Sequence, residues 1–230
     1  MSNAVAIIPV KRFGAAKQRL LEVLDRPERA ALVSAMLADV LAALLRAERV
    51  EVVVVVTGER RAERIALREA RRAAAQLEVL RDPRDVGHSE AATLGIIRAK
   101  ALGAECAALV PGDCPLLDPR ELDDALERMS RGRVVIVPDR HGTGTNALLL
   151  SPPDVIGPAF GPDSCALHAE RGRRAGHTVE VEPLASLGLD LDTPADFAAL
   201  TATLERDPAR APATAAELAR RGRLESRAGA

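Results

Sequence analysis

The chain has 230 residues, enough for one α/β domain with a sizeable core, and a formal net charge of -1, which favours neither nucleic acid nor an anionic membrane as a partner. Aromatic residues are nearly absent, with three Phe and no Trp or Tyr, so a base-stacking surface for single-stranded nucleic acid is disfavoured. The three cysteines, Cys106, Cys114 and Cys165, have no paired spacing and predict neither a zinc site nor a disulfide framework.

No targeting or membrane segment is evident in the sequence. Residues 1–9 have no basic segment and too short an apolar run for a signal peptide. No apolar run approaches the roughly 20 residues that span a bilayer. We therefore expect a cytoplasmic protein that has neither a membrane nor a nucleic acid as its partner.

Short apolar runs alternate with helical patterns along the chain. The runs that predict strands are residues 4–10, 50–57, 77–80, 106–110, 134–138 and 146–150. The valine-rich run 50–57 is continuous enough to be buried on both faces of a sheet. The intervening residues 28–46, 60–75 and 91–102 have apolar side chains at helical spacing. This alternation predicts right-handed crossovers and a mostly parallel sheet.

The later part of the chain contains two clear helix starts and a change of composition. Asp118-Pro119 and Thr193-Pro194 each place a capping side chain before a proline, with an acid two residues later. Residues 179–181 and 187–191 predict two further strands, so the sheet is expected to be mixed. We expect one domain over residues 1–207 and a mobile Pro/Ala/Arg-rich tail over 208–230, with a short helix at 215–221.

The loop after the first predicted strand is basic. It begins at Pro9 and contains Lys11, Arg12, Lys17 and Arg19 ahead of a helix, an arrangement that can cradle a polyphosphate. It lacks the Gly-Lys-Ser/Thr ending of a Walker loop. A basic loop with solvated side chains is the alternative interpretation.

Acidic residues follow two later segments. Asp113 lies where the strand at 106–110 ends, and ligands gather at the carboxyl ends of parallel strands. Asp190 and Asp192 point to the same side of an extended chain. Converging carboxylates repel one another without a cation, so the three acids suit a divalent metal that carries phosphates. The alternatives are an Asx-turn at Asp113 and a helix cap at Asp192 or Thr193, although capping does not account for Asp190.

Two glycine-rich loops expose backbone N–H groups. They are His141-Gly-Thr-Gly-Thr145-Asn146 and Phe160-Gly161-Pro-Asp163-Ser164, and Ser164 adds a hydroxyl at the apparent start of a helix. Carboxylates and phosphates bind well at such places, while turn chemistry with an N-cap is the alternative. His168, one turn into the helix, is more typical of a structural hydrogen-bonding residue than of a catalyst.

Together these segments occur in the order found in one family. The matching motifs are Val-Lys11, Ala-Lys17-Gln-Arg19-Leu, Pro-Gly-Asp113-Cys-Pro-Leu-Leu, Pro-Asp139 with Gly-Thr145-Asn146-Ala-Leu, Phe-Gly161-Pro-Asp163-Ser164 with His168, and Asp190-Leu-Asp192-Thr-Pro. Over about residues 4–205 the chain resembles the CofC/FbiD family, the guanylyltransferases of coenzyme F-420 biosynthesis.

The resemblance implies a fold and a reaction. The fold is α/β, a three-layer Rossmann-like nucleotide-diphospho-sugar-transferase fold. The reaction is the Mg²⁺-dependent transfer of GMP from GTP to the phosphate of phosphoenolpyruvate, 2-phospho-L-lactate or 3-phospho-D-glycerate, with release of pyrophosphate. The resemblance also implies that a downstream transferase of the same pathway receives the product, and it leaves open whether the protein is a homo-oligomer.

The family's motifs also imply roles for individual residues. The acids that match magnesium ligands are Asp113, Asp190 and Asp192, and the residues that match the holders of the acceptor's carboxylate are Thr145, Gly161 and Ser164. We assign catalysis to Asp113, Lys17 and Arg19, and nucleotide binding to Pro9, Lys11, Lys17, Arg19, Gly87 and Ser89.

Departures from the family's pattern leave the acceptor and the guanine contacts open. The usual Gly-Leu-Asn reads Gly87-His88-Ser89 here, Cys114 replaces a usual Leu, and Cys165 stands where an aromatic residue is common. Two other functions are considered: a nucleotidyltransferase with another nucleotide or a sugar-phosphate acceptor, and a non-catalytic nucleotide-binding module. The absence of a Gly-x-Gly-Thr-Arg loop speaks against sugar-nucleotide enzymes, and the three acids with the basic loop speak against the module.

Overall fold

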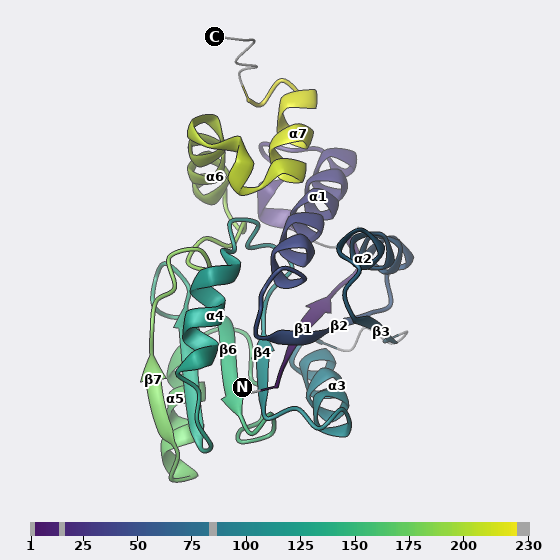
Figure 1. Ribbon diagram of the computed structural model, residues 1–230. Helices are drawn as coiled ribbons and strands as arrows, with labels where there is room; N and C mark the ends of the chain where they lie inside the picture. The colour runs from purple at the N-terminus through teal and green to yellow at the C-terminus, as the bar shows by residue number, and fades with distance from the viewer. Residues whose placement is uncertain (1–2, 14–16, 83–86, 225–230) are drawn as a thin grey trace.

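The computed structural model describes residues 3–13, 17–82 and 87–224, and a sheet of seven strands lies at its centre (Figure 1). The strands are β1 (Ala4–Val10), β2 (Val50–Thr57), β3 (Leu77–Arg81), β4 (Cys106–Leu109), β5 (Arg133–Pro138), β6 (Thr145–Ser151) and β7 (Thr178–Val181). The α-helices are α1 (Arg26–Leu44), α2 (Arg60–Ala73), α3 (His88–Ala101), α4 (Pro119–Glu127), α5 (Ser164–Arg174), α6 (Pro194–Arg206) and α7 (Pro212–Arg220), with short 3-10 turns η2 (Gln18–Leu20) and η3 (Pro208–Arg210).

The sheet is mixed, with one reversed strand. Its order is β3-β2-β1-β4-β6-β5-β7. β6 pairs antiparallel with both β4 and β5, whereas the other described neighbours are parallel. The predicted mostly parallel, mixed sheet is therefore confirmed. Because β6 runs against its neighbours, its first residues lie at the edge where β1 and β4 end.

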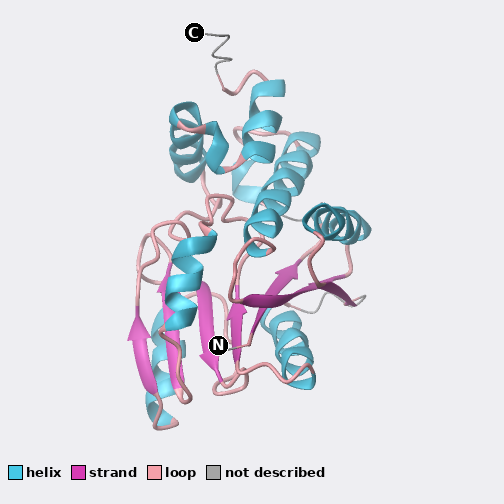
Figure 2. Cartoon of the chain, in the orientation of Figure 1, coloured by secondary structure: helices cyan, strands magenta, loops and turns pink. Residues whose placement is uncertain are grey.

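Helices cover both faces of the sheet (Figure 2). Successive residues of a strand point to opposite faces of the sheet. In β1, Ala6 and Ile8 belong to the cluster with α1, α2 and α4, while Val5 and Ile7 belong to the cluster with α3 and α5. The buried valines of β2 divide between the same two clusters, as the continuous apolar run predicts. The three-layer prediction is confirmed. Across the described residues, no helix combines the length and the apolarity that crossing a membrane requires.

The predicted helix starts are confirmed by their hydrogen bonds. The Asp118 side chain accepts from the N–H of Arg120 at the start of α4. Thr193 and Asp196 form a reciprocal capping box at the start of α6. Arg140 also forms an ion pair with Asp196 at 3.0 Å, which links the β5–β6 connection to this helix. These contacts fix the point at which the segment containing Asp192 enters α6.

The expected strand at 187–191 is wrong. The segment is irregular and pairs with no strand of the described sheet. The Leu187 carbonyl accepts from Asn146 Nδ2 at 2.7 Å, while Leu187 N–H bonds back to Leu184 in a turn. Leu187 and Leu191 are nevertheless buried, so the apolar pattern reflects packing of a loop against the core rather than a strand.

The expected mobile tail is also wrong for residues 208–224. α7 packs beside α1 (Figure 1), where Leu218 is buried. Asp39 on α1 accepts hydrogen bonds from Ala213 N–H at 2.9 Å, Thr214 N–H at 2.7 Å and Thr214 Oγ1 at 2.6 Å. The hydrogen bonds to Asp39 and the packing of small side chains hold this helix against α1. The scarcity of large apolar residues therefore did not indicate a mobile segment. Residues 225–230 lie outside the described part of the chain.

Candidate active site

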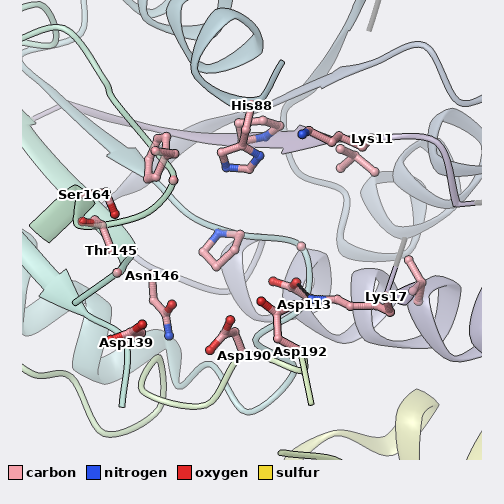
Figure 3. Close-up of a pocket in the computed structure, with 18 of the residues that line it drawn as sticks. Lys11, Lys17, His88, Asp113, Asp139, Thr145, Asn146, Ser164, Asp190 and Asp192 are labelled. Carbon is pink, nitrogen blue, oxygen red and sulfur yellow. Dashed lines mark hydrogen bonds and ion pairs between the residues drawn. The ribbon is translucent and has the colours of Figure 1, made fainter. Parts of the chain in front are cut away.

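A cavity of about 680 Å³ opens at the edge of the sheet where β1 and β4 end and β6 begins (Figure 3). Loops from five separate parts of the chain contribute to its wall. The lining residues are Pro9, Val10, Lys11, Arg12, Phe13, Lys17, Arg19, Val33, Leu37, His88, Pro111, Gly112, Asp113, Asp139, Thr143, Gly144, Thr145, Asn146, Phe160, Gly161, Pro162, Asp163, Ser164, Asp190 and Asp192.

Most of the predicted site residues meet in this cavity. Those that line it are Pro9, Lys11, Lys17, Arg19, Asp113, Thr145, Gly161, Ser164, Asp190 and Asp192. Gly87 and Ser89 are not among the lining residues, so this geometry does not support the nucleotide-binding role predicted for them. The Ser89 hydroxyl instead accepts from the N–H of Phe160 at 2.9 Å and ties α3 to the loop before α5. His88, between the two, faces the cavity.

Lys17 joins two of the three predicted metal ligands. Its ammonium forms an ion pair with Asp113 and lies 2.6 Å from Asp192 Oδ1. The Lys17 side chain is only 10% exposed. Burial alone would lower the pKa of Lys17, but the charges and hydrogen bonds of the two carboxylates raise it above its ordinary value. Lys17 is therefore a fixed positive charge at the centre of the acidic cluster.

Asp190 adds a third acid that the lysine does not fully neutralise. Burial, together with the negative charges of Asp113 and Asp192, raises the pKa of Asp190 to about 6. The charge of Lys17 acts in the opposite direction but is outweighed. With three acids around one ammonium, the site favours further positive charge.

The donor set suits a magnesium ion carried by phosphates better than one held by protein alone. Among residues 3–13, 17–82 and 87–224, no group of three or more His, Cys, Asp or Glu side chains stands ready to hold a metal ion. Asp113 and Asp192 converge on the Lys17 ammonium, which takes the place of a cation. Mg²⁺ prefers oxygen ligands and is commonly bound by one or two carboxylates together with substrate phosphates and water. The residues present fit that mode of binding.

The opposite side of the cavity presents hydroxyl groups. Figure 3 shows Thr145 and Ser164 there, across from Asp113 and Lys17. Thr145 begins β6 and Ser164 begins α5, where the helix dipole favours an anion. Gly161 has φ 137°, a conformation open to glycine but strained for other residues, so the loop can present its backbone here.

His168 connects the parts of this hydroxyl-bearing wall. It is fully buried, its Nδ1 lies 3.0 Å from Thr145 Oγ1, and its Nε2 accepts from the N–H of Ala159 at 2.8 Å. Burial, and secondarily the charge of Arg171, lowers the pKa of His168 to about 4. The imidazole is therefore neutral at pH 7, in keeping with the hydrogen-bonding role expected from the sequence.

Among the cavity residues that were not predicted as site residues, His88, Asn146 and Phe160 have contacts that shape the site. His88 packs edge-on against Phe160, with ring centroids 4.8 Å apart, and burial, followed by the charges of Lys11 and Lys17, lowers its pKa. Asn146 bonds to Leu187 and so positions the segment that leads to Asp190. The sequence feature that could have pointed to His88 is the segment Gly87-His88-Ser89, which departs from the family's usual Gly-Leu-Asn. Asn146 and Phe160 belong to motifs in which only neighbouring residues were assigned a role.

Relatives of the chain are guanylyltransferases by name. Residues 4–205 match a protein-family model described as guanylyl transferase CofC like. A phosphoenolpyruvate guanylyltransferase from Conexibacter woesei is 46% identical over 200 residues, covering 86% of this chain and 87% of that protein. A 3-phospho-D-glycerate guanylyltransferase from Phenylobacterium zucineum is 38% identical over 197 residues, covering 84% and 87% of the two chains.

Solved structures agree on the fold. A protein from Desulfovibrio desulfuricans assigned to the nucleotide-diphospho-sugar transferases superposes with a TM-score of 0.72 at 22% identity, covering 98% of this chain and 100% of that one. A nucleotidyl transferase from Methanothermobacter gives 0.61 at 18% identity, covering 88% and 98%. These likenesses confirm the predicted fold, and the sequence match over residues 4–205 shows that the chain belongs to the CofC guanylyl transferase family.

Proposed function

We propose that this protein transfers GMP from GTP to the phosphate of a small phosphorylated acid, with release of pyrophosphate, in coenzyme F-420 biosynthesis. The acceptors considered are phosphoenolpyruvate, 2-phospho-L-lactate and 3-phospho-D-glycerate. The proposal rests on one observation: a single cavity holds a cationic and acidic half around Lys17 and Asp113 and a hydroxyl-bearing half around Thr145 and Ser164. Its volume of about 680 Å³ lies within the usual range for small-molecule sites.

The reaction needs no protein nucleophile. An oxygen of the acceptor's phosphate attacks the α-phosphorus of GTP, and the bond to the pyrophosphate oxygen breaks. Burial raises the pKa of the Cys114 thiol well above its ordinary value, and it also raises the pKa of Cys165, so neither supplies a thiolate. Catalysis then depends on positioning the two substrates and on neutralising the charge that builds on the leaving group. The cations that line the cavity are Lys11, Arg12, Lys17 and Arg19, and we assign the second task to Lys11, Lys17 and Arg19.

The ion pairs of Lys17 suggest an exchange of partners when GTP binds. Without ligand, the ammonium forms ion pairs with both Asp113 and Asp192. A triphosphate that arrives with a divalent cation offers an anion to Lys17 and a cation to the acids, so no charge is left buried and unpaired. Asp113, Asp190 and Asp192 are the residues that would hold Mg²⁺, which when bound supplies Lewis-acid polarisation of the phosphates.

The hydroxyl-bearing half explains a preference for an acid as the acceptor. The Thr145 and Ser164 hydroxyls and the Gly161 N–H would receive the carboxylate, with the helix dipole of α5 behind Ser164. The product retains a reactive phosphoanhydride bond. We therefore propose that a transferase acting on that bond is the next enzyme in the pathway.

The test is pyrophosphate release from GTP and Mg²⁺ with each of the three acids in turn. We expect release that requires one of these acids and that stops when EDTA removes the metal. ATP, CTP and UTP serve as matched nucleotide controls, and glucose 1-phosphate as an acceptor that lacks a carboxylate. The proposal fails if GTP supports no release with any of the acids, or if a sugar phosphate replaces them.

A further inference from the structure

We propose that His168 is a positioning residue that turns the Thr145 hydroxyl into a hydrogen-bond donor for the acceptor's carboxylate, while it also holds the loop that carries Gly161. The inference rests on the proposed function, since it states how the acceptor half of that site is set. Its core is a hydrogen-bond direction, which can be measured in the protein without substrate.

The first step is the location of the single ring proton. The N–H of Ala159 points to His168 Nε2 at 2.8 Å, and a backbone N–H can only donate. Nε2 must therefore carry a lone pair. The ring is fully buried and neutral, so its one proton is on Nδ1.

The second step follows at Thr145. Since Nδ1 carries the proton, it donates to Thr145 Oγ1 at 3.0 Å. The hydroxyl accepts from the ring, and its own proton must point elsewhere. Among the described residues, no other hydrogen-bond partner of this hydroxyl is found, and Thr145 lines the cavity. Its proton is therefore available to an anion bound there.

The opposite tautomer would have the opposite effect. A proton on Nε2 would clash with the Ala159 N–H and leave Nδ1 as an acceptor for the Thr145 hydroxyl. Thr145 would then present only lone pairs to the cavity, and these repel a carboxylate. The Ala159 N–H, in the loop before α5, thus sets the polarity of the Thr145 hydroxyl at the start of β6, with His168 as the intermediary.

The third step concerns the loop before α5. His168 holds Ala159, the Ser89 hydroxyl holds the next N–H at Phe160, and the Phe160 ring lies edge-on to His168 with centroids 5.3 Å apart. Gly161 follows directly. One side chain on α5 therefore fixes both the Thr145 hydroxyl and the approach to Gly161.

The kinetic test is a double-mutant cycle between His168→Gln and Thr145→Val. A glutamine carbonyl can take the place of Nε2 and accept from Ala159, but it leaves no donor for Thr145. We expect His168→Gln to raise the acceptor KM about 10-fold, the scale of one hydrogen bond, with the GTP KM within about 2-fold of wild type. In the Thr145→Val background the same change should add almost nothing. Independent, additive effects of the two changes, or an equal rise in both KM values, would overturn the proposal.

A spectroscopic test needs no turnover, and it uses the His168→Gln variant only to assign the His168 signals. In ligand-free wild-type protein labelled with ¹⁵N-histidine at pH 7, two-bond ¹H–¹⁵N correlations report which ring nitrogen is protonated. We expect one neutral histidine with its proton on Nδ1, at signals that His168→Gln removes. A proton on Nε2, or a charged ring, would overturn the assignment. If none of the three acids supports pyrophosphate release, the proposed function fails, and the spectrum alone still decides the hydrogen-bond direction.

Discussion

Lys17 determines the charge balance of the cavity. It is nearly buried and lies between Asp113 and Asp192, which are distant from it in sequence. Removing one member of a buried ion pair leaves the others without compensation, which generally costs several kcal/mol. Substitutions in this cluster are therefore expected to change ligand affinity as well as the rate of transfer.

Asp113→Asn removes a carboxylate while conserving its shape. We expect turnover to fall by more than about 100-fold, the scale of removing a principal electrostatic stabiliser. Pyrophosphate release at saturating GTP and acceptor measures this. Asp154→Asn is the matched control, because Asp154 pairs with Lys100 on the surface away from the cavity. Near-normal release by Asp113→Asn would contradict the assignment of this acid.

Lys17→Met tests the proposal that the Lys17 ammonium exchanges the carboxylates of Asp113 and Asp192 for the phosphates of GTP. Without the ammonium, Asp113 and Asp192 repel each other, so Mn²⁺ binding to the nucleotide-free protein should tighten about 10-fold, while the GTP KM rises by at least about 10-fold. Calorimetric titration with MnCl₂ and steady-state kinetics measure the two effects. Lys11→Met is the control, because Lys11 lines the cavity but forms no ion pair with these acids. It should raise the GTP KM without tightening the binding of Mn²⁺. Unchanged Mn²⁺ affinity in Lys17→Met would argue against the exchange.

Ser164→Ala tests the hydroxyl at the start of α5. Loss of one hydrogen bond to a charged group should raise the acceptor KM by about 10-fold and leave the GTP KM nearly constant. Ser130→Ala, in the exposed turn before β5, is the control for serine removal. An unaltered acceptor KM in Ser164→Ala would place the carboxylate elsewhere in the cavity.

At the scale of elements, the attachment of α7 to α1 is polar. Burial raises the pKa of Asp39, and the hydrogen bonds from Ala213 and Thr214 act against that rise. Asp39→Ala leaves buried N–H and hydroxyl donors without an acceptor. We expect the free energy of unfolding to fall by about 2–3 kcal/mol.

Urea denaturation at pH 7 measures this loss. Asp124→Ala, on the exposed side of α4, should change the free energy of unfolding by less than about 0.5 kcal/mol. If Asp39→Ala also changed the free energy of unfolding by less than about 0.5 kcal/mol, α7 would have to be held by its apolar contacts alone.

The elements that could be predicted from sequence are those set by local chemistry. Capping side chains placed the starts of α4 and α6, and apolar runs placed all seven strands. Two segments failed for non-local reasons. Residues 187–191 are apolar because the core buries them, but their hydrogen bonds go to distant side chains such as Asn146. α7 folds because Asp39, far away in sequence, caps it.

At the scale of the whole molecule, buried neutral histidine links stability to pH. In the unfolded chain His168 titrates near 6.5, whereas in the folded protein its pKa is about 4. Between these values the unfolded chain binds the extra proton, so stability is fully present above about pH 6.5 and is lost as the pH falls toward 4. The difference corresponds to at most about 3 kcal/mol.

Urea midpoints at pH 7.5 and pH 4.5 measure this loss. The lowered pKa of His88 acts in the same direction, so wild type and His168→Gln should both weaken in acid, the variant by less. An identical loss in the two proteins would mean that the pKa of His168 is not lowered in the folded protein.

The location of the site could be predicted from sequence, whereas its internal pairing could not. The acids, the basic loop and the glycine-rich loops all reach one cavity, because strand ends meet at one edge of the sheet. Which of Gly87, His88 and Ser89 faces that cavity depends on how α3 is rotated against β1. The bond from His168 to Thr145 depends on a packing contact between α5 and β6. Neither relationship leaves a local sequence pattern.

The reversal of β6 divides the cavity into parts that can vary separately. Lys17 and Asp113 follow strands that run toward this edge, whereas Thr145 begins the strand that returns from it. Part of the wall proposed to face the acceptor is thus the tip of a hairpin, residues 139–144, whose length can change without moving β1 or β4. Insertions and deletions at that tip would resize the acceptor pocket while the nucleotide side stayed constant. Relatives that use different three-carbon acids are therefore expected to diverge there first, and exchanging hairpin tips between them is a route to engineered acceptor choice.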